Sequence, residues 1–224
     1  MQQESLASTP GGQRRTSDVP HPQTPGLVRM EHTNAPRLAP LARGGGVLTW
    51  LMKRFFRWKF GREMAPLSLL FPRFPGMVSG HLRLVPAAQT APDLDPLLVH
   101  LVELRTSLLN GCTFCADLHR ALAHDQHPDA QGIARRKLAA LERLEDEVFS
   151  DQERAALRYT EEVTRNRTAS DAVFQELARH FSDRQIVQLT VVNAVINYTN
   201  LMALPLGLQD QGFCALVDER RAGR

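Results

Sequence analysis

Helix start signals recur along this chain, and they constrain its fold more than any other feature. Asp95 followed by Pro96 joins a good N-cap residue to a proline at the first helical position. Two capping-box sequences, Ser150–Glu153 and Ser182–Gln185, predict further helix starts, and Ser170 can cap a helix between them. Strand signals are weak and no fixed-period repeat is present. The sequence therefore predicts an all-α, bundle-like domain of roughly seven or eight helices.

The chain is long enough for one domain with an additional tail. Its 224 residues are 43% hydrophobic, which is enough for a packed core. Residues 1–46 contain six prolines and end in three glycines, so we expect a disordered tail there and a helical domain over 47–224. No run of 18 apolar residues and no signal-peptide pattern is present, so we expect a cytoplasmic protein.

Basic residues are concentrated at the front of the chain. Residues 1–73 carry 11 Lys or Arg against 4 Asp or Glu, whereas the remainder carries 16 against 20. The early cations are scattered among Pro, Gly, Ser and Thr, so we expect neither a nucleic acid nor a membrane as partner. The aromatic and basic segment 47–60 is typical of a membrane-surface or partner-binding helix, or of one whose aromatics pack on the domain. We favour the second interpretation.

Other segments give weaker signals. Five prolines over 66–92 predict short helical pieces and loops. A leucine stripe predicts a helix from Pro96 to Asn110, and Pro128 can open a short helix toward Leu141. The helix expected from Ser182 to Ala203 is apolar nearly all round, which is typical of a central or subunit-interface helix. Its polar residues could line a pocket facing the thiols or, as we favour, hydrogen-bond within the core or face a neighbouring subunit: Asn193, Asn197, Tyr198 and Asn200.

A Cys-x-x-Cys motif contains two of the three cysteines. Cys112, Cys115 and His119 fall at i, i+3 and i+7, which places them on one face of a helix. Asn110-Gly111 breaks the chain just before the motif, so the motif should open a helix, where the dipole favours thiolate. Cys115 could then attack a hydroperoxide, Cys112 could resolve the sulfenic acid into a disulfide, and His119 could accept the thiol proton.

Two other chemistries compete for these thiols. Zinc would find only three local ligands where a structural site needs four, and neither His124 nor His127 pairs with a second Cys-x-x-Cys. We therefore expect no metal centre. Inert burial as small hydrophobes is the remaining interpretation, and it is the one we favour for Cys214.

A proton relay through His119 needs a further group. If the helices flanking Gly111 form a hairpin, His119 lies about 12 Å beyond the turn, while Glu103 lies about 12 Å and His100 about 16 Å before it. Both can approach His119. Glu103 points away from the leucine stripe, which favours an exposed position, whereas His100 flanks the stripe and should be partly buried.

The segment Leu104–Cys115, with His119 following, resembles the alkylhydroperoxidase D-like (AhpD-like) branch of the carboxymuconolactone decarboxylase superfamily. Residues 57–70 and 193–213 are similar to the lead-in and closing segments of that branch. The resemblance implies an all-helical domain that forms trimers or hexamers and needs no cofactor. It also implies a thiol peroxidase that reduces hydroperoxides and is recycled by a dithiol protein or a lipoyl-type donor.

The resemblance also implies the role of each residue. Cys115 would be peroxidatic, Cys112 resolving and His119 the relay histidine. The relay glutamate of this branch lies twelve residues before the first cysteine, where this chain has His100, and Glu103 could substitute for it. Two rival functions remain: a redox-responsive oligomeric module without turnover, and a lactone decarboxylase-type enzyme, a branch that does not rely on a Cys-x-x-Cys.

Overall fold

The computed structural model describes residues 35–42, 44–127, 132–143 and 146–222, which all belong to one compact unit, Thr33–Arg224. The expected tail over 1–46 lies largely outside the described residues, and so does Pro128. Of the described part of that tail, Arg37 and Leu41 donate backbone hydrogen bonds to the carbonyls of Leu206 and Ser68, both at 2.9 Å.

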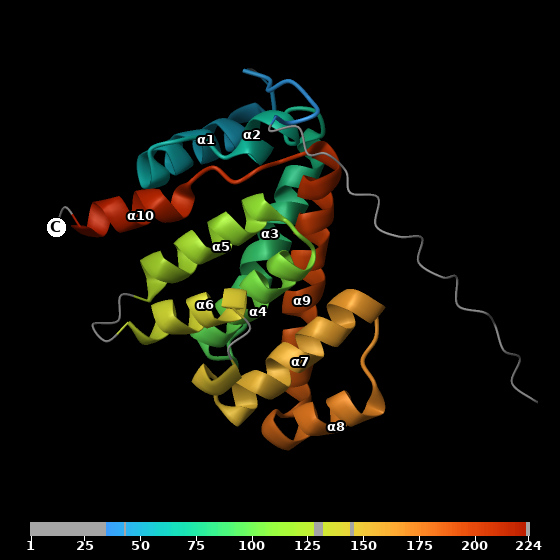
Figure 1. The fold of residues 1–224 in the computed structure, drawn as a ribbon. Helices are drawn as coiled ribbons and strands as arrows, with labels where there is room; N and C mark the ends of the chain where they lie inside the picture. Colours follow the sequence, from blue (N-terminus) through green and yellow to red (C-terminus); the bar gives the residue numbers. More distant parts are fainter. Residues whose placement is uncertain (1–34, 43, 128–131, 144–145, 223–224) are drawn as a thin grey trace, which may run out of the picture. The chain divides into compact units, whose positions relative to one another are not determined.

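The described residues form helices and contain no strand (Figure 1). The helices are α1 (Gly46–Phe60), α2 (Ala65–Leu69), η1 (Pro75–Met77), α3 (Val78–Gln89), α4 (Pro96–Leu109), α5 (Thr113–Gln126), α6 (Ile133–Arg143), η2 (Asp146–Val148), α7 (Asp151–Asn166), α8 (Asp171–His180), α9 (Asp183–Ala203), η3 (Leu204–Leu206) and α10 (Phe213–Ala222). The all-α class is confirmed. The described helices outnumber the expected seven or eight, because α2, α3 and α10 add to those with clear sequence signals.

The predicted helix starts are confirmed by their caps. Asp95 Oδ1 accepts hydrogen bonds from the N–H groups of Leu97 and Leu98, and both capping boxes are formed, at Ser150 and Ser182. The expectation of only short pieces over 66–92 is wrong for α3, which runs for 12 residues. Its Pro86 lies inside this helix, where it removes one backbone N–H donor while the helix continues to Gln89.

Helix α4 lies at the centre of the fold. It packs against α5, α6, α7 and α9, and its residues from Leu98 to Ser107 are all buried. The chain then turns at Gly111, whose φ of 70° is a left-handed conformation that glycine adopts without strain. This turn returns the chain so that α5 packs along α4. The two helices that flank the Cys-x-x-Cys are therefore held in contact.

Helix α9 is the long core helix, drawn in red in Figure 1. Among the described residues, Asp183–Leu206 is long and apolar enough, by length and composition alone, to cross a membrane. A core helix can have the same composition, and α9 packs against α3, α4, α7 and α8. Asn193 donates to the hydroxyls of Thr106 and Thr164, both at 2.9 Å. The core interpretation of its asparagines is thus confirmed.

The aromatic helix α1 packs against α2 and α10. Phe60 is fully buried, with its ring 5.3 Å from that of Phe213. Trp50 and Trp58 are 59% and 78% exposed, so the expectation that the aromatics pack on the domain is right for only part of the helix. A 15-residue helix on the surface of a fold has room for only some of its side chains on the inward face.

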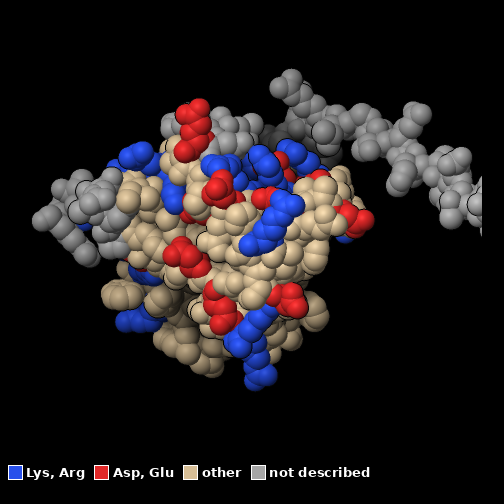
Figure 2. Space-filling view, turned by 90° about the horizontal axis from the view of Figure 1, so that it is seen from below, with Lys and Arg blue, Asp and Glu red and all other residues tan. Residues whose placement is uncertain are grey.

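Charged residues of both signs are interspersed on the face of the molecule in Figure 2. Among the described residues of the protein, several charged side chains form pairs of opposite charge, including Arg184 with Asp93 at 2.6 Å and Arg154 with Asp151. Mixed charge of this kind is typical of a solvated surface.

Replacing Asn193 by leucine is expected to lower the free energy of unfolding by about 1–3 kcal/mol, because two buried threonine hydroxyls lose their donor. Urea denaturation followed by circular dichroism measures the change. The matched control is Asn166→Leu at the exposed end of α7, for which we expect a change within about 0.5 kcal/mol. Equal losses in both variants would contradict a role for the Asn193 network.

Candidate functional site

The two cysteines of the motif lie at the start of α5, as predicted. Cys112 is the N-cap residue, and its sulfur accepts the N–H of Cys115 at 3.3 Å. The two sulfurs form a disulfide, with the Cα atoms 5.3 Å apart. Both residues are buried, at 1% and 4% exposure. The pair is therefore described in its oxidised form.

Glu103 joins the two histidines that the sequence singled out. Its Oε2 lies 3.1 Å from Nδ1 of His119 and 2.9 Å from Nδ1 of His100. The expectation that Glu103 is exposed is wrong, since it is 0% exposed. The leucine stripe does not mark the only buried face of α4, because α5, α6, α7 and α9 all pack on this helix and every residue from Leu98 to Ser107 is buried. His100, also buried, reaches His119 only through this carboxylate.

The contacts among Glu103, His100 and His119 favour the charged forms of Glu103 and His100. Burial raises the pKa of Glu103, but the charge of His119 and hydrogen bonds from both histidines outweigh it and lower the pKa to about 2. Burial lowers the pKa of His100, yet the hydrogen bond to Glu103, its negative charge and the hydrogen bond to Gln126 raise it overall. Nε2 of His100 lies 3.1 Å from Oε1 of Gln126. Both ring nitrogens thus face acceptor oxygens, which suits the protonated imidazolium.

An apolar cavity of about 370 Å³ opens on Cys115 and His119. Side chains from α1, α2, α3, α5 and α9 line it, among them Met52, Leu67, Phe71, Val85 and Met202. With Nδ1 of His119 beside Glu103, Nε2 is the ring nitrogen left for other contacts.

The cavity also contains a histidine that sequence reasoning missed. His81 lies on its wall, with Nδ1 3.4 Å from the hydroxyl of Tyr198. Burial lowers the pKa of His81 and raises that of Tyr198, which favours the neutral form of both. A single histidine in a proline-rich segment has no neighbouring motif that would predict its place on the cavity wall.

Cys112 faces a different opening. A more open groove of about 450 Å³ is lined by Cys112, Asp117, Arg120, Asp210 and Cys214, among others. Asp117 is buried and accepts the backbone N–H groups of three residues at the start of α10: Gln211, Phe213 and Cys214. The two residues of the disulfide therefore line two different pockets, of which the one at Cys115 is apolar and the one at Cys112 is more polar.

Other residues of the motif hold the helices in place. Asn110, at the end of α4, donates to the side-chain oxygens of Asn197 and Asn200, both at 2.9 Å. The guanidinium of Arg105 binds Glu161 and the carbonyl of Leu141. These contacts fix the α4–α5 turn against α9, and α4 against α7, which keeps the Cys-x-x-Cys in register with Glu103.

Among the described residues, one group of three side chains has the spacing of a metal site: His124, Cys214 and Asp218. It does not include Cys112 or Cys115.

Replacing Glu103 by glutamine should lower the free energy of unfolding by about 3 kcal/mol at mildly acidic pH. The pKa of Glu103 falls from its ordinary value of 4.5 to about 2 in the folded protein. This shift stabilises the fold fully above pH 4.5, and the stabilisation is lost as the pH falls toward 2. The raised pKa of His100 stabilises the fold below pH 6.5, and this second contribution to stability is lost as the pH rises through the folded-state pKa of His100. The difference between wild type and variant should therefore be larger near pH 5.5 than near pH 8.5 in urea denaturation.

The matched control is Glu176→Gln, which removes a surface carboxylate that also pairs with a histidine, His180. We expect little change at either pH, because solvent screens that pair. A pH-independent loss in Glu103→Gln would contradict a charged Glu103–His100 pair.

Comparisons with known proteins agree with this fold. The model of the carboxymuconolactone decarboxylase family matches residues 83–162. One similar solved structure is of a protein of unknown function from Agrobacterium tumefaciens, whose name links it to the antioxidant defence protein AhpD. It is 30% identical to this chain and has a TM-score of 0.55, and the match covers 62% of this chain and 93% of that one. The uncharacterized protein YnjA of Escherichia coli K12 is 28% identical over 128 residues, which are 57% of this chain and 68% of YnjA.

The debrominase Bmp8 has a similar fold, with a TM-score of 0.66 at 19% identity over 80% of this chain and 95% of that one. At this identity the likeness concerns the fold alone. The family model covers the helices that carry the Cys-x-x-Cys and its histidines. This chain therefore belongs to the carboxymuconolactone decarboxylase family, in its AhpD-like branch.

Proposed function

We propose that this protein is a thiol-dependent peroxidase that reduces organic hydroperoxides. One observation carries the proposal: Cys115 and His119 line the same apolar cavity, and the ring of His119 is held from behind by a buried carboxylate. A thiol next to an oriented imidazole can ionise, and an apolar cavity accepts the organic part of a hydroperoxide.

The reaction begins with the reduced pair. Nε2 of His119 accepts the proton of the Cys115 thiol, and the thiolate attacks the terminal oxygen of the hydroperoxide. The O–O bond breaks, the alcohol leaves with the proton from His119, and Cys115 becomes a sulfenic acid. The thiol of Cys112 then attacks that sulfur, so that water leaves and the Cys112–Cys115 disulfide forms. A dithiol donor returns both cysteines to thiols and is itself oxidised to a disulfide.

Glu103 orients His119 and stabilises the imidazolium that forms when the thiol gives up its proton. His100 acts as a positioning residue, because it contacts Glu103 rather than His119. The family pattern has its carboxylate at position 100, where this chain has a histidine. In this arrangement Glu103 supplies the carboxylate instead, and His100 supplies a compensating positive charge.

The two pockets suggest how substrate and reductant are separated. A hydroperoxide would enter the apolar cavity at Cys115, and a dithiol protein or lipoyl-type donor would meet Cys112 from the polar groove. The enzyme would need no bound cofactor and would act in the cytoplasm. We also infer a trimer or hexamer, and exposed apolar residues on α9 offer a surface for it: Val187, Val191 and Leu201.

Peroxidase activity should depend on both cysteines and on His119. With tert-butyl hydroperoxide and dihydrolipoamide, we expect Cys115→Ser and Cys112→Ser to abolish turnover, and His119→Gln to lower it about 100-fold or more. The control is His180→Gln, a histidine that pairs with Glu176 at the end of α8, which should keep wild-type activity. Consumption of hydroperoxide is followed directly.

Other outcomes would favour the rival functions. Reversible disulfide formation without turnover, with this and other dithiol donors, would favour a redox-responsive module. A lactone-decarboxylating activity that survives Cys115→Ser would favour an enzyme of the decarboxylase type.

The size of the cavity should set the substrate preference. Val85→Phe places a larger ring in the cavity, so kcat/KM for cumene hydroperoxide should fall by at least about tenfold, while that for hydrogen peroxide changes little. Steady-state kinetics with the two substrates measure this ratio. A parallel fall for both would mean that the cavity does not bind the organic group.

A further inference from the structure

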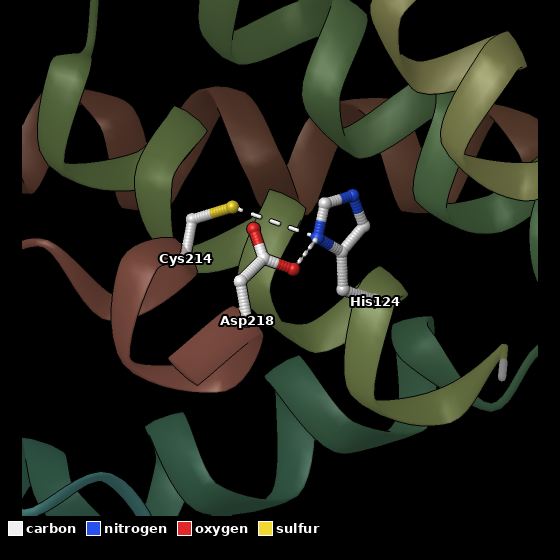
Figure 3. A group of neighbouring side chains, drawn as sticks. All are labelled: His124, Cys214 and Asp218. Carbon is white, nitrogen blue, oxygen red and sulfur yellow. Dashed lines mark hydrogen bonds and ion pairs between the residues drawn. The ribbon is translucent and has the colours of Figure 1, made fainter. Parts of the chain in front are cut away.

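A cluster of three metal-ligating side chains lies between α5 and α10, and the proposed peroxidase reaction does not use it (Figure 3). His124 is in the last turn of α5, Cys214 is in the first turn of α10, and Asp218 is one turn further along α10. Figure 3 shows the thiol and the carboxylate both directed at the same imidazole nitrogen.

Two of the distances between these side chains match those of ligands around one ion. Sγ of Cys214 lies 3.6 Å from Nδ1 of His124, and Oδ1 of Asp218 lies 3.4 Å from the same nitrogen. All three ligand atoms lie within 4.8 Å of one another. Zinc forms bonds of about 2.3 Å to sulfur and about 2.0–2.1 Å to nitrogen and oxygen. In a tetrahedral site, these bonds place sulfur about 3.6 Å from nitrogen and nitrogen about 3.3 Å from oxygen.

Hydrogen bonding alone explains this convergence less well. Nδ1 of an imidazole makes one good hydrogen bond, either donating to the carboxylate of Asp218 or accepting from the thiol of Cys214, whereas both groups face it here. The nitrogen–oxygen distance is also longer than a good hydrogen bond. A cation among the three atoms could bind the thiolate, the imidazole nitrogen and the carboxylate oxygen at the same time.

The surroundings suit an ion with an open coordination position. His124 is 8% exposed, whereas the side chain of Asp218 is 44% exposed, so solvent can reach the cluster from one side and supply a fourth ligand. Arg135 also lies 3.3 Å from Oδ1 of Asp218, but its side chain is 62% exposed and this surface pair is weak enough for an ion to displace.

We propose that His124, Cys214 and Asp218 bind a divalent ion of the zinc class. A thiolate, an imidazole and one carboxylate favour zinc or cobalt over magnesium or calcium, which prefer oxygen ligands alone. On binding, the thiol of Cys214 releases its proton to solvent and His124 keeps its proton on Nε2. The ion would tie the end of α5 to α10 and hold the third cysteine away from the disulfide chemistry in the groove that it shares with Cys112.

Cobalt reports directly on such a site, since a thiolate ligand gives an intense near-ultraviolet charge-transfer band. Titrating the full-length protein with Co²⁺ should give this band with saturation at one ion per chain. Cys214→Ser should lose the band, and Asp218→Asn should bind at least about tenfold more weakly. Zn²⁺ should displace the cobalt.

The matched control is the double variant Cys112→Ser/Cys115→Ser, which removes the other two thiols and should keep the band and its affinity. Zn²⁺ should also raise the melting temperature of wild type and of this double variant but not of Cys214→Ser. A band that survives in Cys214→Ser, or disappears in the double variant, would place the ion at the Cys-x-x-Cys and overturn the proposal. Absence of any band in wild type would overturn it as well.

Should Cys214→Ser fail to fold, as judged by circular dichroism, Asp218→Asn decides the proposal, because its side chain is 44% exposed and its loss should leave the fold intact. Unchanged cobalt affinity in Asp218→Asn would then contradict the three-ligand site. Peroxidase activity measured in parallel keeps this result separate from that of the proposed function.

Discussion

The site depends on one buried carboxylate. Glu103 is 0% exposed in the most enclosed helix of the fold, and an isolated charge there would be costly. Two imidazoles reach the same oxygen and make its burial possible. The same contacts orient His119 toward the cavity that holds Cys115. Stability of the core and orientation of the proposed base therefore come from a single interaction.

The turn at Gly111 connects this core to the thiols. Because α5 returns along α4, a histidine one turn beyond Cys115 comes level with a carboxylate on the preceding helix. Asn110 fixes the turn through Asn197 and Asn200 on α9. The disulfide, the relay cluster and the asparagine network are thus consecutive parts of one helical hairpin held against the core helix.

The disulfide lies between two pockets of different character. The apolar cavity is lined by Cys115 and the more polar groove by Cys112, so the two halves of the proposed peroxidase cycle would use two different pockets. Asp117 organises the groove by accepting three backbone N–H groups at the start of α10. The same placement of α10 brings Cys214 to His124 and creates the proposed metal site.

The sequence by itself determined the helices and the local motif. Caps at Asp95, Ser150 and Ser182 are local interactions, as is the opening of α5 at the Cys-x-x-Cys, so their residues suffice to predict them. Tertiary structure decided the burial of Glu103, the cavity walls and the meeting of Cys214 with His124, 90 residues apart. These depend on which helices cover which faces, and a hydrophobic stripe does not reveal that when a central helix such as α4 is buried on every side.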